Sequence, residues 1–227
     1  MITVGGIDWA VTRKLREALK GAPENGRFVF GVSHCNNLEQ LERFRAARVP
    51  CPDFTTDYKQ AQAWLAEGHT VFGRKLYHTQ GKDIIIAAPY RGGVGFTPNW
   101  PIHFRTKRDY WVKFVPNVKE EWRIHVFDGR SIARGLKIND GDDTTGLIKN
   151  RGHDYHMTHK VEPPEGLRSV AKKAVKALKD YLYGGVDLLL CEDGRVLALE
   201  VNAAPAMDNY TRGKYVQAIR GHFAKAR

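Results

Sequence analysis

One stretch of the chain, "GGVDLLLCEDGRVLALEVNAAP" at residues 184–205, predicts a buried β-hairpin and constrains the fold more than any other feature. Its two apolar runs have the length of strands. The Asp-Gly pair between them, Asp193 and Gly194, favours the two-residue turns that join antiparallel strands. The expected facing pairs are then Glu192 with Arg195, Leu189 with Ala198, and Asp187 with Glu200.

The polar residues of this hairpin predict a cation site. Side chains alternate between the two faces of a strand, so Asn202 is expected on the side of Glu200. Facing carboxylates repel each other unless a cation lies between them. Carboxylate and amide oxygens suit Mg²⁺ or Mn²⁺, so we expect Asp187, Glu200 and Asn202 to be metal ligands. The alternative is that they are charged residues on a solvated sheet face.

A second hairpin, "EEWRIHVFDGRSIARGLKI" at residues 120–138, predicts an anion site. A turn at its Asp-Gly pair places Arg123 opposite Arg134. An anion relieves the repulsion between two facing guanidiniums, and Arg is suited to bidentate phosphate recognition. A divalent cation site beside an anion site is what a metal–polyphosphate such as Mg-ATP needs. Here too, a solvated sheet face is the alternative.

The composition limits the class of protein. The chain is 42% hydrophobic, and none of its apolar runs approaches the roughly 20 residues of a membrane helix. The N-terminal "MITVGGIDWAVTRKLREALKG" is too short and too interrupted in its apolar part for a signal peptide. Cys35, Cys51 and Cys191 lack metal-ligand spacing and predict reduced thiols in a cytoplasmic protein. The net charge of +11 favours an acidic partner, such as a nucleotide, a nucleic acid or a carboxylate-rich substrate.

The order of expected elements predicts an α+β fold with at least two sheets, because helices and strands are interleaved but the hairpins are antiparallel. Two prolines in "RVPCPDFT" mark a boundary near residue 50. The polar segment at 139–165 is expected to be a loop. Helices are expected at about 10–20, 38–47, 58–68 and 165–182, and further strands at 27–32, 70–76, 83–90 and 110–115.

These parts, in this order, resemble the ATP-grasp superfamily, in which two α+β subdomains hold ATP between antiparallel sheets. "VFGRKLYHTQGKDIIIA" is similar to its strand–glycine loop–strand, although the loop lacks the usual glycine density. "YWVKFVP" is similar to the hinge strand that contacts adenine, and "GVDLLL…LALEVNAAP" to the metal motif of the glutamate-adding branch. The resemblance implies ATP contacts at Arg74, Thr79, Gln80, Gly81, Lys82, Lys113, Phe114 and Val115, and catalytic roles for Arg123 and Arg134.

The resemblance covers about residues 36–210 and implies a division into three parts. A reduced N-terminal α/β segment would span 1–50, and the two ATP-grasp subdomains would span 51–115 and 116–227. It also implies an ATP-dependent carboxylate–amine ligase that works through an acyl phosphate, with a small-molecule or peptide carboxylate and an amine as substrates. An acidic polymer, either nucleic acid or an acidic protein tail, is a further possible acceptor substrate. Such an acceptor would explain the basic net charge of the chain. Compact members occur in bacteriophages, which would place the protein in a host cytoplasm.

Several alternatives stay open. The chain could be a basic nucleic-acid-binding protein, or a nucleotide-binding regulator without turnover. "RGHDYHMTH", with His153, His156 and His159, has the spacing of a zinc tract, but a polar loop is the simpler interpretation. Trp100, Trp111 and Trp122 could stack on nucleobases, although strand periodicity favours the core for Trp111.

Overall fold

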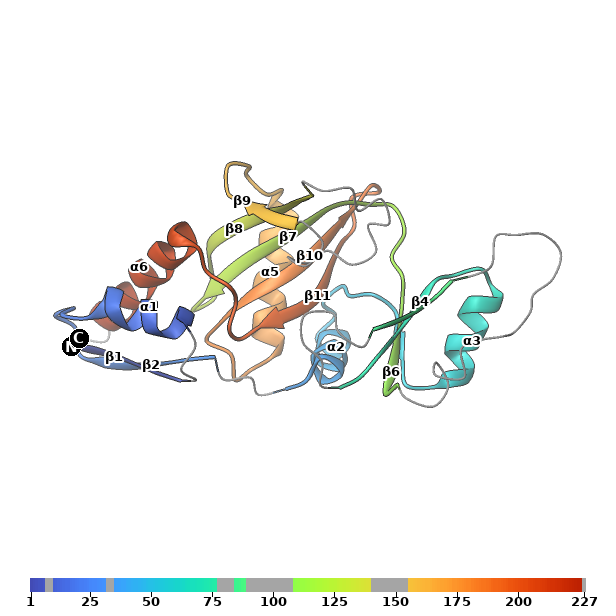
Figure 1. The fold of residues 1–227 in the computed structure, drawn as a ribbon, viewed down its shortest axis with the longest axis horizontal. Helices are drawn as coiled ribbons and strands as arrows, with labels where there is room; N and C mark the ends of the chain where they lie inside the picture. The colour runs from blue at the N-terminus through green and yellow to red at the C-terminus, as the bar shows by residue number, and fades with distance from the viewer. Residues whose placement is uncertain (7–9, 32–34, 77–83, 89–107, 140–154, 226–227) are drawn as a thin grey trace.

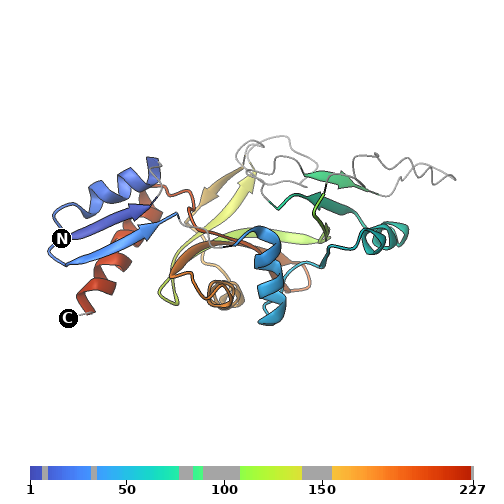
Figure 2. The same cartoon turned by 90° about the horizontal axis from the view of Figure 1, so that it is seen from below.

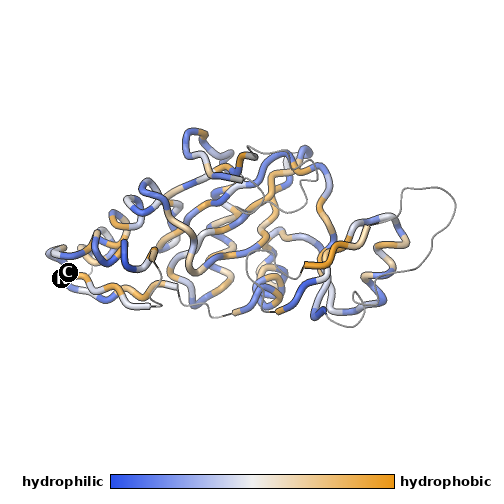
Figure 3. The backbone as a smooth tube through the Cα atoms, viewed as in Figure 1, coloured by the Kyte–Doolittle hydropathy of each residue, from blue (hydrophilic) through white to orange (hydrophobic). Residues whose placement is uncertain are grey.

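The structure, a computed structural model, describes residues 1–6, 10–31, 35–76, 84–88, 108–139 and 155–225 of the 227-residue chain. Within these ranges the chain forms three sheets, which follow one another along the long axis of the molecule (Figure 1). Apolar residues follow the strands of these sheets (Figure 3). No helix of the described ranges has both the length and the apolar character needed to cross a bilayer.

The central sheet is antiparallel, with five strands in the order β11-β10-β7-β8-β9. The apolar residues of β7 and β10, among them Trp122, Ile124 and Val186, are fully buried against the helices on one face. Side chains alternate along a strand, so Arg123 and Asp187 point to the other face. The strands are β7 (Val118–Phe127), β8 (Arg130–Asn139), β9 (Tyr155–Thr158), β10 (Tyr183–Cys191) and β11 (Val196–Asn202).

Helices α5 (Glu165–Ala177) and α2 (Asn37–Ala46) lie side by side on the apolar face of this sheet (Figure 2). The predicted helix is confirmed over Glu165–Ala177, with Leu167, Ala171 and Ala174 buried and the lysines between them exposed. The helix ends at Ala177, earlier than predicted. Lys179 has a positive φ of 34°, and the chain turns there into β10, which leaves Leu182 39% exposed.

The second sheet is antiparallel, with four strands in the order β3-β6-β4-β5. Trp111 is buried beside Ala61 and Leu65 of the overlying helix α3 (Tyr58–Ala66), and Trp122 is buried in the central core. The interpretation of Trp111 as a core residue is therefore confirmed, whereas Trp100 lies outside the described residues. The strands are β3 (Phe54–Thr55), β4 (Val71–Arg74), β5 (Ile85–Ala87) and β6 (Tyr110–Lys113).

The two ends of the chain pack together. Strands β1 (Ile2–Gly6) and β2 (Gly26–Phe30) pair in parallel, and their apolar side chains meet α1 (Ala10–Leu19) and α6 (Asn209–Lys225) in one cluster (Figure 1). Strands β1 and β9 and helix α6 were not predicted from the sequence. The division at residues 50 and 115 stays a prediction, but two elements pack across it: α2 joins the central sheet, and α6 joins the N-terminal strands.

Candidate functional site

The β10–β11 hairpin brings three polar side chains together on the open face of the central sheet. Asp187 pairs with Glu200, and Gly185 pairs with Asn202. The Nδ2 atom of Asn202 lies 3.1 Å from Oε1 of Glu200 and 3.5 Å from Oδ2 of Asp187. The predicted facing of Asp187 and Glu200, with Asn202 on the same side, is therefore confirmed.

The rest of the predicted pairing in this hairpin is wrong. The turn holds three residues, Glu192 to Gly194, and the amide of Cys191 donates to the Arg195 carbonyl, so Glu192 does not face Arg195. Leu188, not Leu189, pairs with Ala198. A β-bulge at Leu199 then adds one residue to β11 and restores the predicted register from Glu200 onward. Two one-residue irregularities thus cancel before the polar residues are reached.

Asp187 is the centre of a buried charge network. Its Oδ1 and Oδ2 accept from Nε and Nη2 of Arg123 at 2.6 and 2.7 Å, and Lys137 lies 3.8 Å from Oδ2. Burial alone would raise the pKa of Asp187, but Arg123 and Lys137 outweigh it and hold the pKa at about 2. Lys137 also pairs with buried Glu121. Neither Lys137 nor Glu121 was predicted from the sequence to belong to the site.

The arginine pair is not arranged as predicted. Arg123 pairs with Gly135, and Arg134 pairs with Ile124, because a bulge at Ile132 shifts β8 by one residue beyond the turn. The bulge avoids facing guanidiniums and lets Ile132 pack against the N-terminal cluster. Arg134 instead donates to the Val161 carbonyl at 2.9 Å and to the Tyr210 hydroxyl at 3.1 Å, and pairs with Glu162.

The three oxygen-bearing side chains fit a hard divalent cation. Each carboxylate oxygen of Asp187 keeps a lone pair beyond its bond to Arg123, and Asn202 offers its amide oxygen when the amide is turned over. Mg²⁺ takes one or two carboxylates and completes its shell with water and phosphate. Across the described residues, no group of three His, Cys, Asp or Glu side chains could hold a metal, so a site here depends on Asn202.

Helix α2 covers the outer edge of β11 at the same place. The side chain of Gln40 donates to the Val201 carbonyl at 3.2 Å and accepts from the Val201 amide at 2.7 Å. Asn37 donates to Oε2 of Glu200 at 2.9 Å. The side-chain amide of Gln40 thus makes the two hydrogen bonds that a neighbouring strand would make with Val201. These bonds fix the backbone between Glu200 and Asn202. These partners are more than 160 residues away in sequence and were not predicted from it.

The small sheet contributes Arg74, at the end of β4 and opposite Tyr110 of β6. The Nε atom of Arg74 is buried and has no hydrogen-bond partner within the described ranges. Burial raises the pKa of Tyr110, the Arg74 charge opposes that shift and the Glu200 charge adds to it. Arg74 and the acidic hairpin therefore lie close to the same tyrosine.

The other predicted ATP contacts are placed only in part. Thr79, Gln80, Gly81 and Lys82 lie outside the described residues. In the predicted hinge, the Lys113 amide donates to the Asp53 carbonyl at 2.8 Å and the Phe114 amide to Thr70 at 2.9 Å. Because those two amides already have backbone partners, the predicted adenine contact is left to Val115 and to the carbonyl groups of the hinge. Val115 packs in an apolar cluster with Leu189 and Leu199, beside the acidic residues.

The histidine tract is not a loop over its described part, because His156 lies in β9, which extends the central sheet at β8. The Nδ1 atom of His159 bonds the Arg134 carbonyl, and its Nε2 atom bonds the carboxylate of Asp208. His153 lies outside the described residues. His159 thus connects β8 to the start of α6.

Two antiparallel sheets with helices packed on them make this an α+β protein, and the central sheet carries a buried cluster of charged residues. Solved structures identify the fold. The ATP-grasp ligase PsnB, complexed with a minimal precursor, gives a TM-score of 0.63 at 16% identity, over 93% of this chain and 68% of its own. D-alanine–D-alanine ligase from Bacillus anthracis gives 0.61 at 12% identity, over 97% and 91%.

The macrocyclase MdnC from Microcystis aeruginosa, bound with precursor peptide MdnA, gives a TM-score of 0.54 at 16% identity, over 96% of this chain and 72% of its own. No family model matches the sequence, and no curated protein matches it. The chain therefore has the ATP-grasp fold, which confirms the predicted fold class and the resemblance at the level of structure.

Proposed function

We propose that this protein is an ATP-dependent, ADP-forming carboxylate–amine ligase. The observation that carries the proposal is the pairing of Asp187 with Glu200 on one sheet face, with Asn202 beside them and Arg123 bonded to Asp187. The fold of known ligases supports it. A peptide carboxylate or amine is a candidate substrate, since PsnB and MdnC are described in complex with precursor peptides.

The reaction needs two transfers. The γ-phosphoryl group of ATP passes to a carboxylate oxygen of the substrate, and ADP leaves. An amine then attacks the acyl phosphate, loses a proton and expels phosphate, which forms the amide. Mg²⁺ or Mn²⁺ held by Asp187, Glu200 and Asn202 would supply charge neutralisation on the phosphates.

The residues of this chain have separate tasks in that scheme. Arg74 offers a buried guanidinium donor to the phosphates from the small sheet. Arg123, held in place by both oxygens of Asp187, presents a fixed positive charge to the transferred phosphoryl group and to the oxyanion of the second step. Arg134 is tied to the segment before α5 and to Tyr210, so its proposed role is to orient the substrate end of the site.

The test is ADP release with Mg-ATP against a panel of amino acids, polyamines and acidic peptides. Wild-type protein should release ADP with at least one pair and should unfold at a higher temperature when Mg²⁺ and ATP are both present. Glu200→Ala should abolish both effects. Glu192→Ala, an exposed carboxylate on the same hairpin, is the matched control and should keep them.

The outcomes separate the alternatives. A thermal shift without ADP release would indicate a nucleotide-binding regulator. Indifference to Mg-ATP, together with binding of oligonucleotides that falls steeply with salt, would indicate a nucleic-acid-binding protein. Full turnover by Glu200→Ala would show that the metal site is misassigned.

A further inference from the structure

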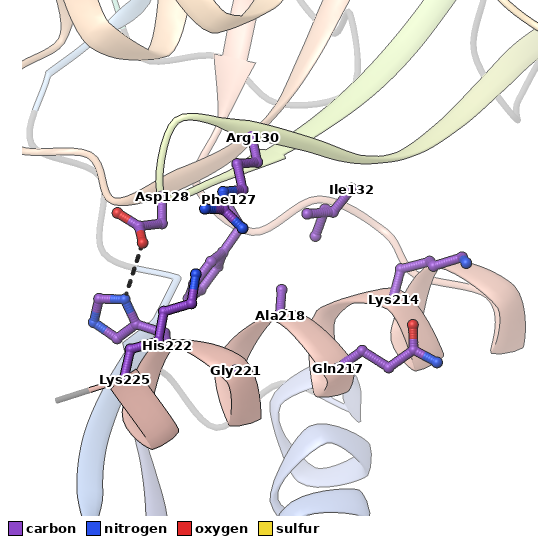
Figure 4. A pocket seen from close by; sticks show the side chains of 10 residues that line it. All are labelled: Phe127, Asp128, Arg130, Ile132, Lys214, Gln217, Ala218, Gly221, His222 and Lys225. Atoms are coloured by element: carbon purple, nitrogen blue, oxygen red, sulfur yellow. Dashed lines mark hydrogen bonds and ion pairs between the residues drawn. The ribbon is translucent and has the colours of Figure 1, made fainter. Parts of the chain in front are cut away.

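A cavity of about 380 Å³ lies away from the candidate active site, between the tip of the β7–β8 hairpin and the second half of α6 (Figure 4). Phe127 at its floor pairs with Tyr183 at the start of β10, whereas Arg123 pairs with Asp187. Four residues of strand separate the two positions, about 13 Å. The cavity has the size of a small-ligand site and plays no part in the proposed chemistry.

The lining is cationic. Arg130 comes from β8, and Lys214 and Lys225 come from α6. None of these three pairs with a carboxylate among the described residues. The one acidic lining residue, Asp128, is engaged by His222, whose Nδ1 atom lies 3.2 Å from its Oδ2 atom (Figure 4). The cavity therefore has three positive charges to offer an anion.

The spacing of these charges selects an extended ligand. Lys214 and Lys225 are eleven residues apart on one helix, about 16 Å at the rise of an α-helix. A single phosphate needs donors that converge, whereas these cations are spread out, with Ile132 and Ala218 as an apolar floor between them. About five residues of extended peptide span that length.

The aromatic content argues against nucleic acid. Single-stranded nucleic acid binds by stacking its bases on exposed aromatic side chains. Phe127 is only 2% exposed, and the His222 ring packs edge-on against it at 5.8 Å between centroids. The lining therefore offers no free ring face at Phe127, and charge with an apolar floor favours a peptide.

We propose that this groove along α6 binds an extended acidic peptide segment, with carboxylates at Lys225, Arg130 and Lys214. The groove also leads to Tyr210 and Arg134. The ammonium of Lys214 lies 5.6 Å from the Tyr210 ring centre, and Tyr210 bonds Arg134. A segment bound from Lys225 to Lys214 is thus directed to Arg134, the residue proposed to orient the substrate, so the groove would recruit an acidic peptide substrate. That last step rests on the proposed function, whereas the binding itself does not.

The test measures binding without nucleotide, so that its failure is distinct from failure of the ligase proposal. The probe is a fluorescein-labelled decapeptide of alternating Glu and Leu, followed by fluorescence anisotropy with the full chain. A salt concentration of about 0.15 M screens charges more than about 8 Å away. The Lys214→Glu/Lys225→Glu double variant should weaken binding about tenfold, since two attractive pairs become repulsive.

The matched control is Lys172→Glu/Lys176→Glu on the exposed face of α5, which changes the net charge by the same amount. It should weaken binding less than twofold, and Arg130→Glu should weaken it about threefold. Equal weakening by the two double variants would overturn the proposal, because the effect would then be general charge. Equal binding of a Gln–Leu peptide, or tighter binding of a ten-nucleotide oligothymidylate at the same groove, would also overturn it.

Discussion

The β7–β8 and β10–β11 hairpins are neighbours in one sheet, and each turn contains an Asp-Gly pair. Their charged residues are nevertheless arranged differently. In β10–β11 an extra turn residue and a bulge at Leu199 compensate, so the acidic residues stay together. In β7–β8 the bulge at Ile132 is uncompensated, so Arg123 and Arg134 lie at positions that do not face each other. The difference shows that a bulge and the length of the turn together decide which side chains meet.

The two arginines give the largest expected contrast. Arg123→Gln removes the bidentate partner of Asp187, which is 5% exposed, and should lower the free energy of unfolding by about 3–5 kcal/mol because a buried charge loses its ion pair. Arg134→Gln should cost about 1 kcal/mol or less, since Glu162 is 65% exposed and solvent screens the pair. Urea unfolding followed by circular dichroism measures both. Equal losses would show that the two hairpins do not differ in this way.

A second contrast concerns the edge of β11, which α2 covers. Gln40→Leu keeps the volume but removes both partners of the buried Val201 backbone, so it should cost about 3 kcal/mol. It should also reduce the rise in unfolding temperature that Mg²⁺ and ATP produce. This reduction should be larger than the loss of stability alone would cause. Glu42→Ala, exposed on the same helix, is the control and should change neither value. An unchanged Mg²⁺ response in Gln40→Leu would show that α2 does not position the acidic residues.

How much of this could be predicted from sequence depends on the range of the interaction. Strand alternation and turn composition placed Asp187 opposite Glu200, although the success needed two irregularities to cancel. The partner of Lys137 could not be predicted, because its approach to Glu121 requires the shift at Ile132. The role of Gln40 could not be predicted either, since a side-chain amide that bonds a distant strand edge leaves no pattern in the neighbouring sequence.

The missed elements have a similar explanation. In α6 the fully buried residues are few, Thr211, Tyr215 and Ile219, and the charged residues around them obscure a helical stripe. Strand β1 is short, and its alternation at Ile2 and Val4 becomes meaningful only beside β2. The sequence thus predicted the fold class and the acidic site, while tertiary packing decided the arginine geometry and the N-terminal unit.

His125 lies in β7 beside the bulge of the β7–β8 hairpin and predicts a pH effect of intermediate size. Burial lowers its pKa from 6.5 to about 3, and the Arg123 charge adds to the shift. The folded protein therefore keeps it neutral, while the unfolded chain takes up a proton below pH 6.5. Stability from this group is complete above pH 6.5 and is lost as the pH falls, about 2 kcal/mol between pH 6.5 and 5.

Urea unfolding at several pH values between 5 and 7 tests this. His125→Gln should flatten the dependence of the unfolding free energy on pH, whatever its effect on stability at pH 7. His69→Gln, on an exposed side chain, is the control and should leave the slope unchanged. A slope that is the same in wild-type and His125→Gln would contradict the assignment of the neutral form.

The smallest effects are expected at the turns themselves. Gly129 and Gly194 have φ of 68° and 83°, and a Cβ at either position would meet nothing within 4 Å. Alanine should therefore cost about 1 kcal/mol at each, from backbone strain alone. If bulges set the register, both variants should keep the wild-type thermal shift with Mg²⁺ and ATP. Loss of that shift in Gly194→Ala alone would mean that the turn, and not the bulge at Leu199, holds Glu200 opposite Asp187.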